Sequence, residues 1–235
     1  MSIFHKAMLS GAVQMCGAED DPQLQLILLE PTGEVVALNR WAIYAAAPVP
    51  SVIKTSLSIN TTDKILAAPV VVSRAQIELL VKNIPADKQF KSLLEHVSIT
   101  NRDGNVLNAT FNDGRGERSM SLRSMQTYPA LSQWRQRFQA LGKAVAFSNF
   151  VYNRARLEYV MSAIGAACKY SGEFDYIAQQ EFEHGFIWKT KNGQLNQVIL
   201  IAWVCSIASP EVSLWEQSLL IKPTALSRPK QCPAN

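Results

Sequence analysis

A segment that reads as a strand running into a helix occurs twice in this chain, eighty residues apart. The first copy is VVSRAQIELLVKNI (71–84) and the second is VYNRARLEYVMSAI (151–164). The identical positions of the first copy are Val71, Arg74, Ala75, Glu78 and Ile84. Since a repeat of this size means that one supersecondary unit is used more than once, it restricts the chain to modular folds.

The first copy opens a module of one helix and three strands. Ser73 is a suitable N-cap, and Pro85 follows an apolar stripe at helical spacing, formed by Ile77, Leu80, Val81 and Ile84. Strands are predicted at 96–100, 105–111 and 117–124, separated by the Asp-Gly pairs at 103–104 and 113–114.

Two further modules have the same order of elements. In the third, a strand at 144–151 precedes a helix that buries Leu157, Val160, Met161 and Ile164, and strands follow at 174–182, 185–190 and 196–207. The first is recognisable by pattern only: a helix between Phe4 and Met15, then strands at 24–30 and 34–46. We therefore predict an α+β fold of repeated helix-plus-antiparallel-strand modules, with the helices on one face of the sheets.

The repeat also predicts the domain division. Residues 1–126 form one domain of two modules, 1–66 and 67–126. Residues 127–143 are a linker, 144–207 are the third module and 208–235 are an extended tail. In the linker, Trp134 and Phe138 lie among basic residues, a composition that can bind nucleic acid. We favour the alternative, in which these aromatic side chains cover the edge of the core.

Composition restricts the class of protein. The net charge of +4 and the pI near 8.9 permit a nucleic-acid partner without requiring one. The four cysteines have no paired spacing, which predicts a reduced, cytoplasmic protein. The N-terminus does not read as a signal peptide, and the apolar run at 198–208 is too short to cross a membrane as a helix. No membrane partner is expected.

Five segments carry a likeness to a known family. AMLSGAVQMCGAEDDPQLQLILLEPTGEVVALNRWAIYAA supplies an opening helix, a strand and a turn into the next strand, and APVVVSRAQIELLVKNI supplies the next strand and helix. SMSLRSMQTYPAL resembles the step from a last strand into a linker, and VAFSNFVYNRARLEYVMSAIG with LNQVILIAWV resembles a closing module. In order and spacing the chain resembles the DNA sliding clamps, and the bacterial beta-clamp type of DNA polymerase processivity factor most of all.

The resemblance implies a function without catalysis or cofactor. A clamp tethers replication proteins, such as a DNA polymerase, to double-stranded DNA without reading its sequence. Phosphate contacts come from Lys and Arg on the helices that line the ring. The candidates here are Lys6, Arg74, Lys82, Arg154, Arg156 and Lys169. Taken singly, each of these is better interpreted as an exposed side chain of a solvated helix face, with Arg74–Glu78 and Arg154–Glu158 as ion pairs. The recurrence of the arginine at 74 and 154 makes the phosphate contact as good an interpretation. Ring formation implies a homo-oligomer.

Two peptide-binding features also follow from the resemblance. Clamps bind short peptides in an apolar groove, and by position the groove residues here are Trp41, Ile43, Tyr44 and Trp203. The tail segment QSLLI resembles the peptides that bind clamps, with Gln217, Leu220 and Ile221 as the contacts. The alternative for the groove residues is packing in the core.

Catalytic and metal-binding patterns are weak. In EFEHGF, Glu181 and Glu183 share one face of a strand and His184 points to the other, which is a poor arrangement for a metal. DGRGERS precedes a strand and not a helix, so it is no phosphate loop. The alternatives that stay open are a clamp-like adaptor or decoy, which binds replication proteins instead of DNA, and an enzyme on an α+β scaffold without local motifs.

Overall fold

The structure is a computed structural model of the whole chain. It describes residues 2–16, 21–39, 42–47, 66–85, 95–127, 129–139, 142–144, 154–171, 176–182, 185–191 and 198–204. The chain divides into two compact units, 1–204 and 205–235, and all described residues belong to the first.

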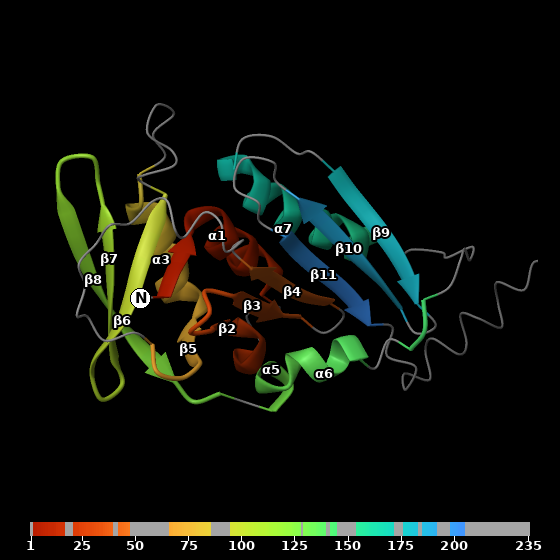
Figure 1. Cartoon of the computed structure of the whole chain (residues 1–235), viewed down its shortest axis with the longest axis horizontal. Helices are drawn as coiled ribbons and strands as arrows, with labels where there is room; N and C mark the ends of the chain where they lie inside the picture. Colours follow the sequence, from red (N-terminus) through yellow and green to blue (C-terminus); the bar gives the residue numbers. More distant parts are fainter. Residues whose placement is uncertain are drawn as a thin grey trace, which may run out of the picture. The chain divides into compact units, whose positions relative to one another are not determined.

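Strands and helices alternate along the first unit in a modular order (Figure 1). The module at the N-terminus contains β1 (Ser2–His5), α1 (Lys6–Met15), the short 3-10 helix η1 (Pro22–Gln25), β2 (Leu26–Leu29), β3 (Val35–Leu38) and β4 (Ala42–Ala47). The second contains β5 (Val70–Ser73), α3 (Arg74–Asn83), β6 (His96–Asp103), β7 (Val106–Asn112) and β8 (Glu117–Met125). After the connector helices α5 (Pro129–Ser132) and α6 (Trp134–Gln139) come α7 (Arg154–Ser171), β9 (Tyr176–Phe182), β10 (Gly185–Lys191) and β11 (Val198–Val204).

The first two modules exchange their leading strands. The described strands form one antiparallel sheet in the order β1-β6-β7-β8-β5-β2-β3-β4-β11-β10-β9. β1 pairs with β6 of the second module, and β5 pairs with β2 of the first. The third module joins at the other end, where β11 pairs with β4. Each leading strand therefore ties its own helix to the sheet of the neighbouring module.

The three long helices lie on one face of this sheet and enclose the main core. α1 contacts both α3 and α7, and Figure 1 shows it between them. Every α1 residue except Gln14 is buried. Burial of a large apolar side chain contributes about 1.5–3 kcal/mol. Phe4, just before α1, and the α1 side chains Met8 and Leu9 are buried in this layer, which is therefore the main source of stability. The α+β class and the placement of the helices are confirmed.

A second apolar cluster lies on the opposite face of β2, β3 and β4. Side chains alternate along a strand, and those that point away from α1 pack against Leu131 and Trp134 of the connector. Trp134 is 5% exposed, and its Nε1 donates to a Glu30 carboxylate oxygen at 3.2 Å. Arg135 lies over the Trp134 ring, 4.5 Å from its centroid, and pairs with Glu30 and Glu34. The prediction that Trp134 covers the core edge is confirmed.

Helix starts and turns agree with the local sequence signals. The Ser73 hydroxyl accepts from the Gln76 backbone N–H at 3.4 Å, and α3 starts at the next residue. Gly104 and Gly114, after Asp103 and Asp113, have positive φ angles of 54° and 83°, which glycine adopts without strain. Both predicted hairpin turns are therefore present.

Three local predictions were wrong. Residues 2–5 form β1 and not the start of the helix, since they pair with β6. The stretch 34–46 is two strands, β3 and β4, because the Asn39 side chain accepts from the Ala42 N–H at 2.6 Å and closes a turn. Met161 is 42% exposed, although the helix stripe placed it in the core.

Candidate functional site

Lys6 lies inside the molecule. Its side chain is 4% exposed, and its ammonium group donates to the carbonyl of Ile84, the C-cap residue of α3. A cation at a helix C-terminus satisfies unpaired carbonyls and interacts favourably with the helix dipole. The prediction that Lys6 reaches DNA phosphates from an exposed helix face is therefore wrong, since this face of α1 is buried and the charge serves to cap α3.

Arg74 occupies the first position of α3 and is half-buried. Its Nη1 donates to the side-chain oxygen of Gln25 at 3.4 Å, a long bond. Its Nε is buried without a hydrogen-bond partner. Within the described part of the chain no carboxylate lies at ion-pairing distance from Arg74. The guanidinium therefore keeps hydrogen-bond donors for which these residues supply no carboxylate, although its charge also contributes to lowering the pKa of Glu78.

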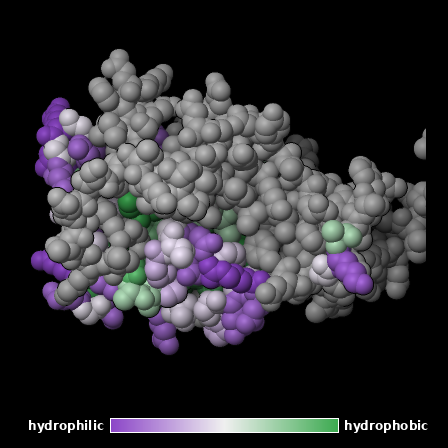
Figure 2. Space-filling model, viewed as in Figure 1, coloured by the Kyte–Doolittle hydropathy of each residue, from purple (hydrophilic) through white to green (hydrophobic). Residues whose placement is uncertain are grey.

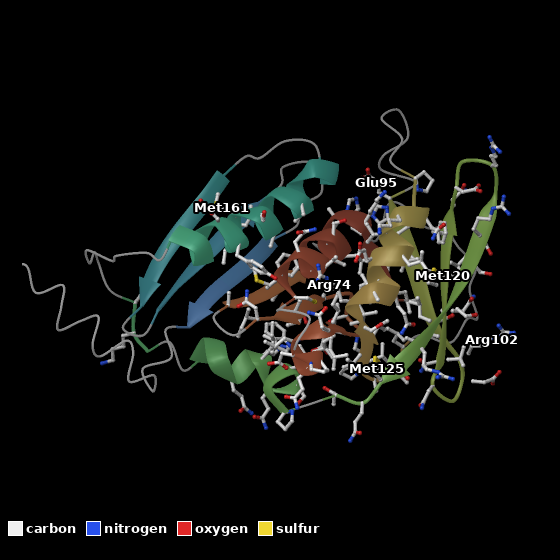
Figure 3. The ribbon with its side chains drawn as sticks, turned by 180° about the vertical axis from the view of Figure 1, so that it is seen from behind. Arg74, Glu95, Arg102, Met120, Met125 and Met161 are labelled. Carbon is white, nitrogen blue, oxygen red and sulfur yellow. The ribbon has the colours of Figure 1, made fainter. Side chains whose placement is uncertain are left out.

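The neighbours of Arg74 come from two other helices. They are Cys16, after the end of α1, and Tyr159 of α7, whose hydroxyl donates to the Cys16 carbonyl. Burial raises the pKa of the Cys16 thiol to about 12, although Arg74 opposes this shift. Burial also raises the pKa of Tyr159, again against the effect of Arg74. Arg74 thus lies where the three repeated helices meet, as Figure 3 shows in its labelled position beside α1 and α3.

Lys82 has a partner on its own helix. Its Nζ lies 2.8 Å from a Glu78 carboxylate oxygen, and the hydrogen bond and charge of Lys82 lower the pKa of Glu78. Lys82 is 69% exposed, so the pair is largely screened by solvent. The sequence suggested Arg74 as the partner of Glu78, but the observed ion pair joins Glu78 to the lysine one turn later.

The other basic candidates lie on α7. Arg154 is the first residue of α7, as Arg74 is of α3, so the repeat holds at the helix starts. Arg156 and Lys169 follow on the same helix. The side chains of all three lie outside the described residues. Their contact with DNA stays a prediction.

Two of the four residues assigned to the predicted peptide groove lie in the core. Ile43 is 2% exposed and packs in the cluster around Trp134. Tyr44 is fully buried, and its hydroxyl donates to the Met8 carbonyl at 3.0 Å. Since neither side chain reaches the surface, the prediction for these two residues was wrong, and core packing is the correct interpretation.

The side chains of the other predicted peptide-contact residues lie outside the described residues. Trp203 belongs to β11, opposite Ala42 in β4, but its side chain is outside the described residues. Trp41 also lies outside them, as do the tail residues Gln217, Leu220 and Ile221. Their roles stay predictions.

A groove that was not predicted from the sequence runs between α3 and β8. It has a volume of about 420 Å³ and is lined by residues of α3, β7, β8 and the turn between these strands, among them Leu79, Asn83, Phe111, Asp113, Arg118 and Met120. Leu79 is 52% exposed there. The only sequence signal was an apolar residue at position 79, outside the buried stripe of α3. An open groove with an exposed leucine can accept an apolar side chain of another molecule.

The known proteins that resemble this chain do so in structure and not in sequence. No family model matches this chain, and no curated protein matches it. The chain is similar in structure to a PCNA2–PCNA3 complex from Sulfolobus tokodaii, with a TM-score of 0.45, 9% identity and coverage of 86% of this chain and 98% of that one. It is also similar to a putative DNA polymerase III beta subunit from Eubacterium rectale, with a TM-score of 0.38, 12% identity and coverage of 86% of this chain and 49% of that one.

The described residues show neither a metal-binding cluster nor a membrane-spanning helix. They contain no cluster of three or more His, Cys, Asp or Glu side chains placed to hold a metal ion. Among the helices of this part of the chain, none combines the length and apolar character needed to span a membrane.

Proposed function

We propose that this protein is a sliding-clamp-like processivity factor, which binds double-stranded DNA through its phosphates and holds replication proteins there. The proposal rests on the gathering of α1, α3 and α7 on one face of a continuous antiparallel sheet, with Arg74 where they meet and no carboxylate of the described residues at ion-pairing distance from it. The resemblance of the sequence to clamps supports it. The role involves no bond-making, and copies of the chain associate on the DNA.

The electrostatics of Arg74 support a phosphate contact. A guanidinium that the described residues leave without a carboxylate partner offers several N–H donors in a fixed geometry, which suits phosphate oxygens. Arg154 starts α7 as Arg74 starts α3, so the two arginines hold equivalent places in the repeat. Since such contacts release counterions, the affinity is expected to fall as salt rises.

The test is binding of a fluorescently labelled 30-base-pair duplex, measured by anisotropy between 50 and 200 mM salt. The variant that combines Arg74→Glu, Arg154→Glu and Arg156→Glu is expected to lose affinity at least about tenfold and to show a shallower salt dependence. Arg102→Glu is the matched control, because Arg102 is exposed on β6 and lies away from Arg74 (Figure 3). Salt-independent binding, no binding, or an equal loss in Arg102→Glu would overturn the proposal.

Oligomeric state provides an independent check on the association of copies. Sedimentation velocity with and without the duplex measures the mass of the protein and of the complex. A monomer under both conditions would contradict a ring or any other assembly of copies on DNA.

A second candidate function is the adaptor, which binds replication proteins and not DNA. It is favoured by the exposed face of α3, where the charges of Glu78 and Lys82 offset each other beside the exposed Leu79. This part of the surface suits an apolar contact better than a phosphate. Absence of salt-dependent DNA binding in the anisotropy experiment, together with binding of a peptide in the groove beside Leu79, would select this function.

A further inference from the structure

Over most of its length, one edge of β8 has no neighbour among the strands that the structure describes. β8 pairs with β7 from Glu117 to Arg123, but with β5 only at Ser124 and Met125. β5 leaves the sheet there because α3 begins at Arg74. Among the described strands, none continues along the β8 edge beyond that point. An unpaired strand edge presents N–H and C=O groups that can pair with another chain.

Gln76 shows what kind of group this edge accepts. Its side-chain oxygen accepts from the Arg123 backbone N–H at 2.6 Å, and its side-chain nitrogen donates to the Arg123 carbonyl at 3.4 Å. The carboxamide of Gln76 therefore takes the place that a peptide group of a neighbouring strand would have. It occupies only the first position of the free edge.

The next positions along the edge face the groove. Because backbone groups alternate in direction along a strand, the outward N–H and C=O groups after Arg123 belong to Ser121, Ser119 and Glu117. Ser119 lines the groove, and Leu79 of α3 lies across from it. Met120 lines the same groove (Figure 3). The free edge thus borders an open, partly apolar space along α3.

We propose that this groove binds an extended peptide segment of a partner protein, which adds to the sheet as a strand antiparallel to β8. Main-chain hydrogen bonds to Glu117, Ser119 and Ser121 supply affinity, as in other cases of strand addition. Pairing from 117 to 121 spans about 17 Å of strand. The bound peptide lies beside β8 in the place that β5 leaves where α3 begins.

The side chains along β8 define the chemistry of the peptide. On the face toward α3, Met120 and Leu79 accept apolar side chains. On the opposite face lies the exposed Arg123, and opposite charges on neighbouring strands stabilise their pairing. The peptide therefore alternates apolar residues with polar residues, including an acidic one near Arg123. Figure 2 shows hydrophilic side chains over the outer hairpin tips.

The experiment is a selection of seven-residue peptides from a random display library on the full chain, followed by calorimetry with a synthetic copy of the most enriched peptide. We expect enrichment of alternating apolar and acidic residues and a Kd in the micromolar range. Ser119→Pro removes one outward N–H and is expected to weaken binding at least about tenfold. Ser119→Ala is the matched control, since it keeps the N–H and is expected to bind like the original chain.

Two further measurements do not depend on the folding of the proline variant. Methylating the peptide nitrogens that face β8 is expected to abolish binding, and Leu79→Asp, at an exposed position, is expected to weaken it at least about tenfold. Failure to enrich any peptide, equal binding to Ser119→Pro, or binding of the methylated peptide would overturn the proposal. Concentration-dependent pairing of copies that Ser119→Pro abolishes would also overturn it, because a second copy would then occupy the edge. These variants leave Arg74 unchanged, so the result of the DNA-binding experiment is independent of the result of the peptide-binding experiment.

Discussion

The phenol ring of Tyr44 occupies the space that a side chain at Gly11 would need. A Cβ atom at Gly11 would lie 2.4 Å from the Tyr44 hydroxyl oxygen and 2.6 Å from its Cζ. The hydroxyl is held by its bond to the Met8 carbonyl at 3.0 Å. α1 therefore approaches the sheet closely only because residue 11 has no side chain.

Gly11→Ala is expected to lower the free energy of unfolding by about 1–3 kcal/mol, the usual cost of overpacking a core. Urea denaturation followed by circular dichroism measures it. Gly165→Ala is the control: a Cβ there meets no atom within 4 Å, and alanine in a helix is expected to add about 0.5–1 kcal/mol. Equal stability of Gly11→Ala and the original chain would contradict the close contact.

Sequence reasoning predicted the second module best because its signals are local. Ser73 caps α3, Ile77 and Leu80 face the core, and the Asp-Gly turns separate the strands. It missed β1 because that strand is short and its partner β6 lies more than ninety residues later. No window of sequence contains such a pairing.

The candidate site was less predictable for the same physical reason. A lysine on an amphipathic helix normally faces solvent, and nothing near Lys6 in the sequence shows that the Ile84 carbonyl lies beside it. No described strand covers most of the β8 edge, because β5 gives way to α3 opposite it. Such sites arise from the positions of distant elements, and periodicity reports only which face of one element is apolar.

Trp134 fixes the connector to the outer face of the sheet, so its removal is expected to be costly. Trp134→Ala should lower the free energy of unfolding by about 3–5 kcal/mol, because a buried aromatic side chain is lost. Trp134→Phe keeps most of the packing and loses the bond to Glu30, for an expected cost of about 1 kcal/mol. Urea denaturation of both variants measures the difference. A change below about 0.5 kcal/mol for Trp134→Ala would mean that the connector does not stabilise the sheet.

Cys16 is expected to resist alkylation while the protein is folded. Its thiol is buried and its pKa is raised to about 12, so the reactive thiolate is disfavoured. Iodoacetamide at pH 8, followed by peptide mass spectrometry, should modify Cys16 only after unfolding in guanidinium. Folding raises this pKa from 9.0. The free energy of unfolding is therefore unaffected by the Cys16 thiol below pH 9, and it declines as pH rises toward 12, because the unfolded chain loses the thiol proton first. Rapid modification of Cys16 in the folded protein would contradict its burial.

Hydrogen exchange along β8 should alternate from residue to residue. The N–H groups of Arg118, Met120 and Leu122 point toward β7 and are expected to exchange slowly, whereas those of Ser119 and Ser121 point to the open edge and are expected to exchange fast. The Arg123 N–H points outward too, but Gln76 accepts from it, so it should be slow.

Variants of Gln76 make this prediction specific, with exchange followed residue by residue by NMR. Gln76→Ala removes the acceptor and is expected to accelerate exchange at Arg123 while Leu122 is unchanged. Gln76→Glu keeps an acceptor oxygen and should preserve the protection. Slow exchange at both Ser119 and Ser121 in the free protein would mean that another part of the chain already pairs with this edge, which would leave no room there for a partner strand.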